Sequence, residues 1–380
     1  MVKDRAAGSI YLKIRSISLY AYNIPMKPFI ISLGTLFEAK NILVSILTDE
    51  GITGWGEGSP FPMIVGETQE SGLALARDFS KMLLGKNALD IPGCMKVLND
   101  FVPNNPTVKS AFDMALYDIG AQHAGLPLYR FLGGEKKPLI TDHTVSIGTA
   151  DEMAAAASAL KERGVTILKL KTGSAKKASE DIHRVKAVRE AVGKDIPLRL
   201  DANQGWNVDD AIEILNALEN DGIQFCEQPV KHFDYDGMRR ISNSVKVPVM
   251  ADESCFYSYQ ARFILEHKIC PYINIKLAKS GGMLEATDIA SITRAGGITC
   301  MLGGMIESRL ALTANAHFAC AHEYIRFYDL DYCFNHHLDP VVNGVEVINA
   351  CEIHLPDLPG IGATVDDKFL ASCDWEIFDE

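Results

Sequence analysis

Three acidic residues end successive apolar segments at a regular interval. Asp201, Glu227 and Asp252 lie 26 and 25 residues apart, and each precedes a turn or a helix start. This interval suits one strand–helix unit, so in a parallel barrel the three carboxylates share the rim of C-terminal strand ends, where barrel enzymes hold their active sites. Clustered carboxylates repel one another and take up protons unless a cation neutralises them. Oxygen-only ligands favour Mg²⁺ or Mn²⁺ over zinc, and the spacing predicts such a site.

Lysines flank the predicted metal site. Lys169 and Lys171 are two residues apart in a short apolar strand, so their side chains share one face. Leu168 and Leu170 share the other face and are expected to pack on helices, which turns the lysines into the barrel mouth. Two neighbouring ammonium groups lower the pKa of at least one of them, which makes a base that works near neutral pH. Lys276 ends another apolar segment and approaches from the far side.

Lysines on both sides of a cation site suit the removal of a proton next to a carboxylate. Such a proton is too weakly acidic for an amine base alone, and a cation that binds the substrate carboxylate stabilises the enediolate that forms. A proton removed on one side and returned on the other inverts the carbon. The alternative, a separate salt bridge or helix cap for each acid, accounts for one such residue better than for three in phase.

The elements that must position these residues alternate between short apolar strands and helix-length amphipathic stretches. This alternation predicts a parallel sheet, and eight strands favour a closed barrel. A doubly wound sheet is the weaker alternative, because no G-x-G-x-x-G follows the first strand. The predicted strands are Thr144–Ile147, Thr166–Lys171, Pro197–Asp201, Gln224–Glu227, Val247–Asp252, Tyr272–Lys276, Ile298–Leu302 and Ile325–Asp329, with helices such as Glu152–Arg163 and Val208–Glu219.

The first 140 residues or so have a different pattern. Residues rich in β-branched and aromatic side chains predict an antiparallel meander, and helical periodicity follows it. We expect an α+β capping domain at 1–138, a barrel at 139–340, and a C-terminal segment 341–380 that packs back on the cap or the barrel exterior. The predicted cap strands and helices are Ile10–Tyr22, Asn41–Thr48, Ile52–Glu57, Gly72–Leu84 and Val108–His123.

Composition excludes several classes of partner. The net charge of −12 over 380 residues argues against binding nucleic acid or an anionic membrane through bulk electrostatics. No apolar run approaches the roughly 20 residues needed to cross a bilayer, and Met1–Ser9 lacks the apolar core of a signal peptide. The nine cysteines form no C-x-x-C pair, so we expect reduced thiols in a cytoplasmic protein.

Around these residues the sequence resembles the enolase superfamily, in particular its muconate lactonizing enzyme subgroup. The resemblance implies an α/β fold made of a modified TIM barrel, (β/α)7β, with an N-terminal α+β capping domain. The matching stretches span nearly the whole chain: Gly54-Trp55-Gly56-Glu57, Leu168-Lys169-Leu170-Lys171-Thr172-Gly173, Leu200-Asp201-Ala202-Asn203, Cys226-Glu227-Gln228-Pro229, Ala251-Asp252-Glu253-Ser254 and Asn274-Ile275-Lys276.

The resemblance also assigns roles to residues. It implies Mg²⁺, with Mn²⁺ as an alternative, held by the acidic trio named above. It implies that Lys171 and Lys276 are the acid–base pair and that Lys169 supports Lys171 and contacts the substrate carboxylate. Lys279 lies three residues past a predicted strand end and is expected to belong to the following loop.

An Asp-x-Asp at the eighth predicted strand favours one activity within the subgroup. Asp329 and Asp331 share one side of that segment and would be costly in a closed site without a cation. Dipeptide epimerases hold the substrate α-ammonium group with a matching pair, and the resemblance carries that role to these residues. Thr144 matches a further pocket position, and Ile306 is expected to line the pocket. The competing interpretation is that Arg326 pairs with one of the two acids.

Two cap segments bear on the choice of dipeptide. Ala-Glu epimerases carry an arginine in a loop that corresponds to residues 27–37, and Gly34 occupies its position here. The second segment, Ser59–Gly66, is apolar. Both features predict inversion of small or hydrophobic residues, such as alanine, at the C-terminal position of a dipeptide. The alternative is that the apolar segment merely packs on the cap.

Other members of the subgroup remain alternatives. They are an N-acyl amino acid racemase, a muconate cycloisomerase and an o-succinylbenzoate synthase. A mandelate racemase-like enzyme is disfavoured, because the seventh strand has no histidine. A non-catalytic member should have lost a ligand or a lysine, and none is missing. The resemblance implies a homo-oligomer with a small-molecule dipeptide substrate.

Overall fold

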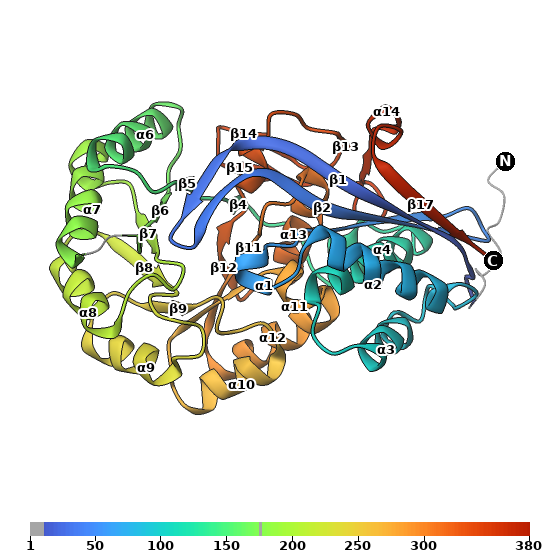
Figure 1. Ribbon diagram of the computed structural model, residues 1–380, viewed down its shortest axis with the longest axis horizontal. Helices are drawn as coiled ribbons and strands as arrows, with labels where there is room; N and C mark the ends of the chain where they lie inside the picture. Colours follow the sequence, from blue (N-terminus) through green and yellow to red (C-terminus); the bar gives the residue numbers. More distant parts are fainter. Residues whose placement is uncertain (1–10, 175–176) are drawn as a thin grey trace.

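The computed structural model describes residues 11–174 and 177–380. Its centre is a sheet of eight parallel strands in the order β12-β11-β10-β9-β8-β7-β6-β5, which confirms the predicted α/β barrel strands (Figure 1). The strands are β5 (His143–Val145), β6 (Leu168–Lys171), β7 (Leu198–Asp201), β8 (Ile223–Glu227), β9 (Val249–Ala251), β10 (Tyr272–Ile275), β11 (Thr299–Gly303) and β12 (Ile325–Asp329).

The two outer strands of this sheet approach each other and close the barrel. The backbone N–H of Asp142 donates to the carbonyl of Tyr328 at 3.3 Å. The N–H of Leu330 donates to the Thr141 hydroxyl at 2.8 Å. Inside, Phe225, Met250 and Met301 are fully buried and pack together, so the lower part of the barrel is a filled core rather than a channel.

Helices cover the outside of the barrel, one after each of the first seven strands. In the described part of the chain, the last barrel strand leads into a 3-10 turn, η1 (Tyr332–Asn335), instead of a covering helix, so the (β/α)7β arrangement is confirmed. The covering helices are α6 (Ala150–Glu162), α7 (Ala178–Val192), α8 (Val208–Ala217), α9 (Tyr235–Ser244), α10 (Ser258–Glu266), α12 (Met283–Gly296) and α13 (Arg309–Ala321), with a short extra helix α11 (Leu277–Ser280) before α12.

A four-stranded antiparallel sheet, in the order β17-β1-β2-β3, forms the cap beside the barrel mouth. One face of it packs its apolar residues against cap helices, for example Ile17 and Val44 with Phe79 and Phe112. The cap elements are β1 (Ile14–Ile31), β2 (Gly34–Thr48), β3 (Thr53–Gly58), α1 (Pro62–Val65), α2 (Gln69–Leu83), α3 (Ile91–Phe101), α4 (Pro106–His123) and α5 (Leu128–Phe131).

The C-terminal segment returns to the cap after leaving the barrel. Its last strand, β17 (Asp374–Asp379), pairs antiparallel with β1. The short elements before it are β13 (Val341–Asn343), β14 (Glu346–Ile348), β15 (Glu352–His354), β16 (Ala363–Val365) and α14 (Asp367–Leu370), and β15 also pairs with β4 (Leu139–Ile140).

The prediction of a loop at residues 27–37 is wrong. Strands β1 and β2 continue through it as a long hairpin that reaches across the barrel mouth (Figure 1). Contacts at the tip stabilise this extension: the Ser32 hydroxyl donates to the carbonyl of Asn203 at 2.7 Å, and the N–H of Ile147 donates to the carbonyl of Ile30 at 3.3 Å. Since these partners lie more than 100 residues away along the chain, local sequence carries no sign of them.

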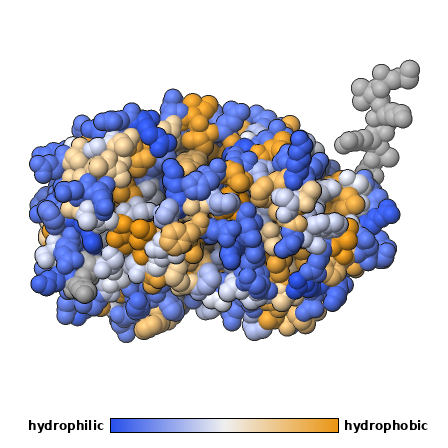
Figure 2. Space-filling view, turned by 45° about the horizontal axis from the view of Figure 1, so that its top comes forward, coloured by the Kyte–Doolittle hydropathy of each residue, from blue (hydrophilic) through white to orange (hydrophobic). Residues whose placement is uncertain are grey.

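The surface of the protein shows a mixture of hydrophilic and hydrophobic side chains. Figure 2 shows one face covered largely by hydrophilic side chains, with hydrophobic patches between them. None of the helices in the described ranges has the length and apolarity that spanning a membrane requires.

Candidate active site

The three predicted metal ligands come from adjacent strands. Asp201 and Glu227 are the last residues of β7 and β8, and Asp252 follows β9 directly. The register places Asp201 opposite Glu227, so these two carboxylates stand at the same height in the barrel. All three side chains are fully buried.

The predicted lysines contact these carboxylates. Lys169 Nζ lies 2.7 Å from Glu227 Oε2 and 3.1 Å from Asp201 Oδ2. Lys171 Nζ donates to Asp201 Oδ2 at 2.6 Å, and Lys276 Nζ donates to Asp252 Oδ2 at 2.7 Å. The site is therefore a network of alternating charges, in which each acid has an ammonium neighbour.

The charges of this network shift several pKa values. Burial and the Asp201 carboxylate raise the pKa of Glu227 to about 8. Burial lowers the pKa of Lys276, but the carboxylates of Asp252 and Glu227 outweigh it and hold the value above its usual range. Repulsion between Lys169 and Lys171 predicts a lowered pKa for at least one of them. The pKa of Lys169 is raised instead: burial lowers it, but the surrounding carboxylates raise it by more.

The donor set suits a hard divalent cation. Glu227 Oε2 is buried and receives no directed hydrogen bond within the described residues, while Asn274 Nδ2 fixes the other oxygen, Oε1, at 2.7 Å. The ion-pair partner of Glu227 is the Lys169 ammonium, 2.7 Å from Oε2, and with a pKa still raised this buried carboxylate is further neutralised either by a proton or by a second cation. Because Asp201, Glu227 and Asp252 offer oxygen only, the residues present fit Mg²⁺.

Lys279 belongs to this network, and the expectation that it lies in a loop is wrong. It sits on α11, is fully buried, and donates to Asp252 Oδ1 and to the Asp252 carbonyl, both at 2.6 Å. Lys276 has an extended backbone just before α11, so Lys279 reaches the same acid through the helical turn that follows.

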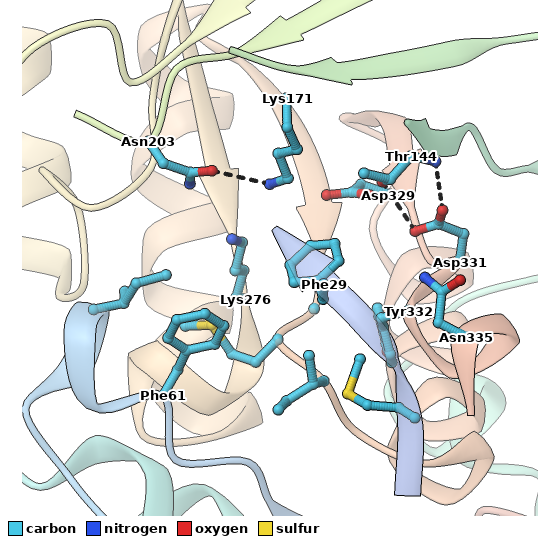
Figure 3. A pocket seen from close by; sticks show the side chains of 15 residues that line it. Phe29, Phe61, Thr144, Lys171, Asn203, Lys276, Asp329, Asp331, Tyr332 and Asn335 are labelled. Carbon is cyan, nitrogen blue, oxygen red and sulfur yellow. Dashed lines mark hydrogen bonds between the residues drawn. The ribbon is translucent and has the colours of Figure 1, made fainter. Parts of the chain in front are cut away.

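The Asp-x-Asp pair lies on the opposite side of the pocket from the cap residue Phe61 (Figure 3). Asp329 Oδ2 accepts from Lys169 Nζ at 2.6 Å. Asp331 Oδ2 accepts from the backbone N–H of Thr144 at 2.6 Å, and its Oδ1 lies 3.4 Å from the Thr144 hydroxyl. The alternative interpretation, that Arg326 pairs with one of these two acids, is wrong, because the Arg326 side chain is exposed whereas both acids are buried.

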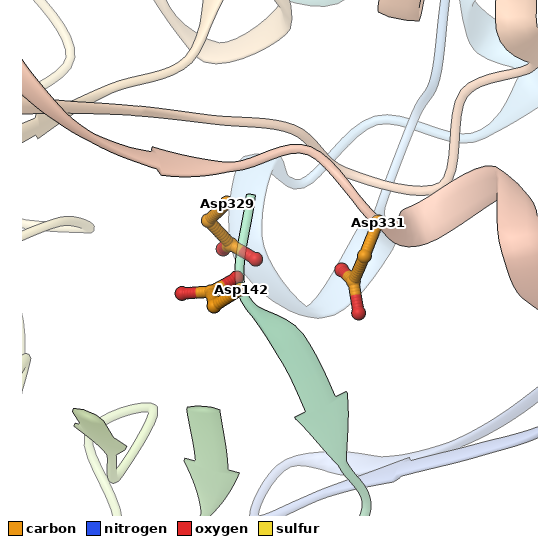
Figure 4. A group of neighbouring side chains, drawn as sticks. All are labelled: Asp142, Asp329 and Asp331. Atoms are coloured by element: carbon orange, nitrogen blue, oxygen red, sulfur yellow. The ribbon is translucent and has the colours of Figure 1, made fainter. Parts of the chain in front are cut away.

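Sequence reasoning missed a third acid beside this pair. Oxygens of Asp142, Asp329 and Asp331 all lie within 4.8 Å of one another, close enough to surround one cation (Figure 4). Arg199 Nη1 donates to Asp142 Oδ2 at 2.7 Å and so offsets part of the charge. The position was available in the sequence: Asp142 precedes Thr144 by two residues and therefore faces the same way.

A small pocket of about 30 Å³ is lined by both predicted catalytic lysines and by the Asp-x-Asp pair. Lys171 and Lys276 enter it from different strands (Figure 3). The aromatic ring of Phe29, on the β1–β2 hairpin, lies 5.6 Å from Lys171 Nζ. The remaining lining residues are Met26, Phe61, Ile64, Thr144, Asn203, Gly304, Met305, Ile306, Asp329, Asp331, Tyr332 and Asn335.

The cap segments predicted to set specificity lie over this pocket. Phe61 and Ile64 line it, so the interpretation that the apolar segment only packs on the cap is wrong. Gly34 begins β2 with a φ of 154°, and a Cβ there would meet Met63 Sδ at 2.8 Å. A side chain at position 34 would therefore require the flexible end of the Met63 side chain to move.

Two family models match the chain in sequence order. The model "Mandelate racemase / muconate lactonizing enzyme, N-terminal domain" matches residues 14–133, and the model "Enolase C-terminal domain-like" matches residues 152–369. The second match alone covers more than half of the chain.

Individual proteins agree with these models. The D-Ala-D/L-Ala epimerase of Cytophaga hutchinsonii is 41% identical over 94% of this chain and 97% of its own length. The hydrophobic dipeptide epimerase of Enterococcus faecalis is 40% identical over 92% of this chain and 99% of its own length. The crystal structure of the dipeptide epimerase from Cytophaga hutchinsonii, complexed with Mg and D-Ala-L-Val, covers 97% of this chain and 100% of its own with a TM-score of 0.95 and 39% identity. The chain belongs to the mandelate racemase/muconate lactonizing enzyme family of the enolase superfamily.

Proposed function

We propose that the protein is a Mg²⁺-dependent dipeptide epimerase that inverts the α-carbon of the C-terminal residue. One observation carries the proposal: Lys171 and Lys276 enter a single pocket from different strands, and an Asp-x-Asp pair lines the same pocket. Two lysines allow a proton to leave one face of a carbon and return to the other. The acid pair supplies the charge that an α-ammonium group needs.

Each lysine acts at one face of the α-carbon. For one epimer Lys171 removes the α-proton while Lys276 donates a proton to the opposite face, and for the other epimer the roles reverse. Asp201, Glu227 and Asp252 would hold the Mg²⁺, which when bound supplies positive charge that stabilises the enediolate form of the substrate carboxylate. Once these carboxylates are neutralised, the field that raises the pKa of Lys276 weakens, and a neutral amine becomes accessible.

The acid pair binds the other end of the dipeptide. Asp331, oriented by the Thr144 N–H, and Asp329 would accept hydrogen bonds from the α-ammonium group. Lys169 would contact the substrate carboxylate and, through its contact with Asp329, connect the two halves of the site. An ammonium group held in this way fixes the α-carbon between the two catalytic lysines.

We further propose that the epimerised residue is small or hydrophobic. Phe29, Phe61, Ile64 and Ile306 give the pocket an apolar wall, and no arginine lines it among the described residues. A glutamate side chain would lose its hydration there without gaining a cation. Relatives named for epimerising D-Ala-D/L-Ala and hydrophobic dipeptides support this preference.

An N-acyl amino acid racemase is the second candidate. A relative from Bacillus cereus, 35% identical over 84% of this chain, is an N-succinyl-L-Arg/Lys racemase. The acid pair argues against this activity, because an N-acyl substrate has no ammonium group to place between two carboxylates.

The domain division at 138 and 340, the homo-oligomeric state and the cytoplasmic location stay proposals that rest on the sequence.

Solvent deuterium exchange tests the proposed function. The protein would be incubated with Mg²⁺ and a pool of dipeptides in D₂O, and mass spectrometry would locate the label. We expect label at the C-terminal residue of Ala-Ala and of dipeptides that end in small apolar residues, and little in Ala-Glu. Absence of label in every dipeptide, with Mg²⁺ binding verified by calorimetry, would reject the epimerase and favour the N-acyl racemase.

A further inference from the structure

A second cavity lies directly behind the apolar wall of the active-site pocket. It has a volume of about 440 Å³, opens to solvent, and lies between the β1–β2 hairpin and the segment that leads into α1. Among the residues that the structure describes, Ile306 alone lines both this outer cavity and the active-site pocket. Its side chain is 3% exposed, so it separates the two spaces from within the protein.

The segment before and in α1 forms the rest of the partition. Phe61 and Ile64 line the active-site pocket, whereas Pro60 and Pro62 line the outer cavity. Successive residues therefore face opposite sides of one thin wall. Removing part of a side chain in such a wall connects the two spaces without moving the backbone.

The backbone at Ile306 is held by the cap. Its N–H donates to the Ser59 hydroxyl at 3.3 Å, and its carbonyl accepts from Asn41 Nδ2 at 3.1 Å. Asn41 Nδ2 also donates to Glu57 Oε1 at 2.8 Å, and Glu57 Oε2 accepts from the Ser308 hydroxyl at 2.6 Å. This buried network fixes the main chain on both sides of Ile306, so the position of the wall does not depend on the Ile306 side chain.

The outer cavity has the chemistry of an apolar side-chain subsite with a polar rim. Leu36, Pro60, Pro62 and Ile306 are among its apolar lining residues, and charged residues such as Lys40 also line it. An aromatic or long aliphatic side chain would remove apolar surface from water there. An acidic or basic side chain would gain no buried counter-charge in its place.

The orientation of the proposed substrate directs its side chain toward this wall. Its ammonium group lies at Asp329 and Asp331, and its α-carbon lies between Lys171 and Lys276. Figure 3 shows Phe61 on the side of the pocket away from Asp331. The side chain of the epimerised residue therefore extends toward the wall formed by the α1 segment and Ile306.

We propose that Ile306 is the partition that limits the size of the epimerised residue, and that the outer cavity is a closed-off extension of its subsite for large apolar or aromatic side chains. This inference rests on the proposed function and deepens it. The wild-type wall admits small residues and excludes large ones. A shorter residue at position 306 opens the extension.

The test compares Ile306→Ala with a matched truncation, Ile64→Ala. Ile64 lines the active-site pocket but not the outer cavity, so its truncation enlarges the pocket without connecting the two spaces. Epimerisation of Ala-Ala and Ala-Phe would be measured for each. We expect the kcat/KM ratio of Ala-Phe to Ala-Ala to rise at least tenfold in Ile306→Ala, and less than threefold in Ile64→Ala.

A double variant shows where the new side chain goes. Leu36 lines the outer cavity, so Leu36→Trp should fill part of it. The double variant Ile306→Ala/Leu36→Trp should therefore return the kcat/KM ratio of Ala-Phe to Ala-Ala to within about threefold of wild type. An unchanged ratio in Ile306→Ala, an equal rise in Ile64→Ala, or a gain that survives Leu36→Trp would overturn the inference. Ile306→Val removes a single methyl group and repeats the test if the alanine variant does not fold. Failure of the wild type to label any dipeptide would instead reject the proposed function.

Discussion

Lys279 donates two hydrogen bonds to Asp252, one to a carboxylate oxygen and one to its backbone carbonyl, each 2.6 Å long. The first fixes Oδ1, so that Oδ2 faces Lys276. A third bond from Lys279 to the Asn274 carbonyl, at 2.8 Å, ties α11 to strand β10. Lys279 is thus a positioning residue for a predicted metal ligand and for a proposed catalytic lysine.

Lys279→Ala should destabilise the protein by about 3 kcal/mol, because it leaves a buried carboxylate with one cation fewer. Urea unfolding measures the change. The matched control is Lys96→Ala, which removes an exposed ion pair with Asp100 and should alter the free energy of unfolding by less than about 0.5 kcal/mol. If Lys279→Ala unfolded within 1 kcal/mol of wild type, its proposed role would be wrong.

Mg²⁺ should raise the melting temperature of the wild type, because an ion that binds only the folded state stabilises it by about 2.7 kcal/mol at a hundred times its Kd. Glu227→Gln should lose most of this shift, since the variant removes the charge of a buried predicted ligand. Differential scanning calorimetry with and without Mg²⁺ gives the readout without any substrate. Glu67→Gln, a buried acid in the cap, is the control and should keep the full shift. An equal shift in wild type and Glu227→Gln would remove Glu227 from the metal site.

Asp331→Asn should raise KM for free dipeptides tenfold or more while leaving kcat within about threefold. An asparagine oxygen still accepts the Thr144 N–H, so the loop keeps its geometry and only the charge is lost. Steady-state kinetics on Ala-Ala and on its N-acetyl derivative separate the two effects. Because the acetylated substrate has no ammonium group, its turnover should change little. Equal losses on both substrates would argue for a structural role.

The sequence predicted where the acids and lysines lie, because parallel strands place equivalent residues at one height. Asp201 and Glu227 are register partners, as the regular spacing required. It missed residues whose position depends on other elements. Lys279 reaches the site through an extra helical turn, and Phe29 does so through a hairpin stabilised by contacts with residues far along the chain. The spacing of the segments predicts residues at strand ends. Tertiary contacts place residues such as Lys279 and Phe29.

The expected charge balance was also incomplete. Repulsion between neighbouring lysines was the obvious local effect, yet the carboxylates around Lys169 outweigh it and raise its pKa. The acid Asp142 escaped notice because its partner, Arg199, lies on a different strand. A sequence gives the charge of each side chain. The net electrostatic effect of these charges at one site depends on the fold that brings them together.

His317 should make the stability depend on pH. Burial lowers its pKa to about 4, and the neutral ring is fully bonded: Nδ1 accepts from the Tyr129 N–H and Nε2 donates to the Ile361 carbonyl. Between pH 6.5 and 4 the unfolded chain binds a proton that the folded chain does not, so stability falls as the pH falls through this window. The loss reaches about 3 kcal/mol at the lower end.

Urea unfolding at several pH values tests this expectation. His317→Gln should show a flatter decline in the free energy of unfolding below pH 6.5 than the wild type. The exposed His183, changed to Gln, serves as the control and should keep the wild-type slope. Parallel slopes for wild type and His317→Gln would mean that His317 does not stay neutral in the folded protein.

The assignment of Lys171 and Lys276 to opposite faces of one carbon is tested most directly by single-epimer exchange. Each epimer of Ala-Ala would be incubated separately with Mg²⁺ in D₂O, using the wild type, Lys171→Ala and Lys276→Ala. We predict that the wild type labels and interconverts both epimers, whereas each variant labels only the epimer whose α-proton faces its remaining lysine, and converts neither. Labelling of the same epimer by both variants, or interconversion by either at the wild-type rate, would contradict the assignment.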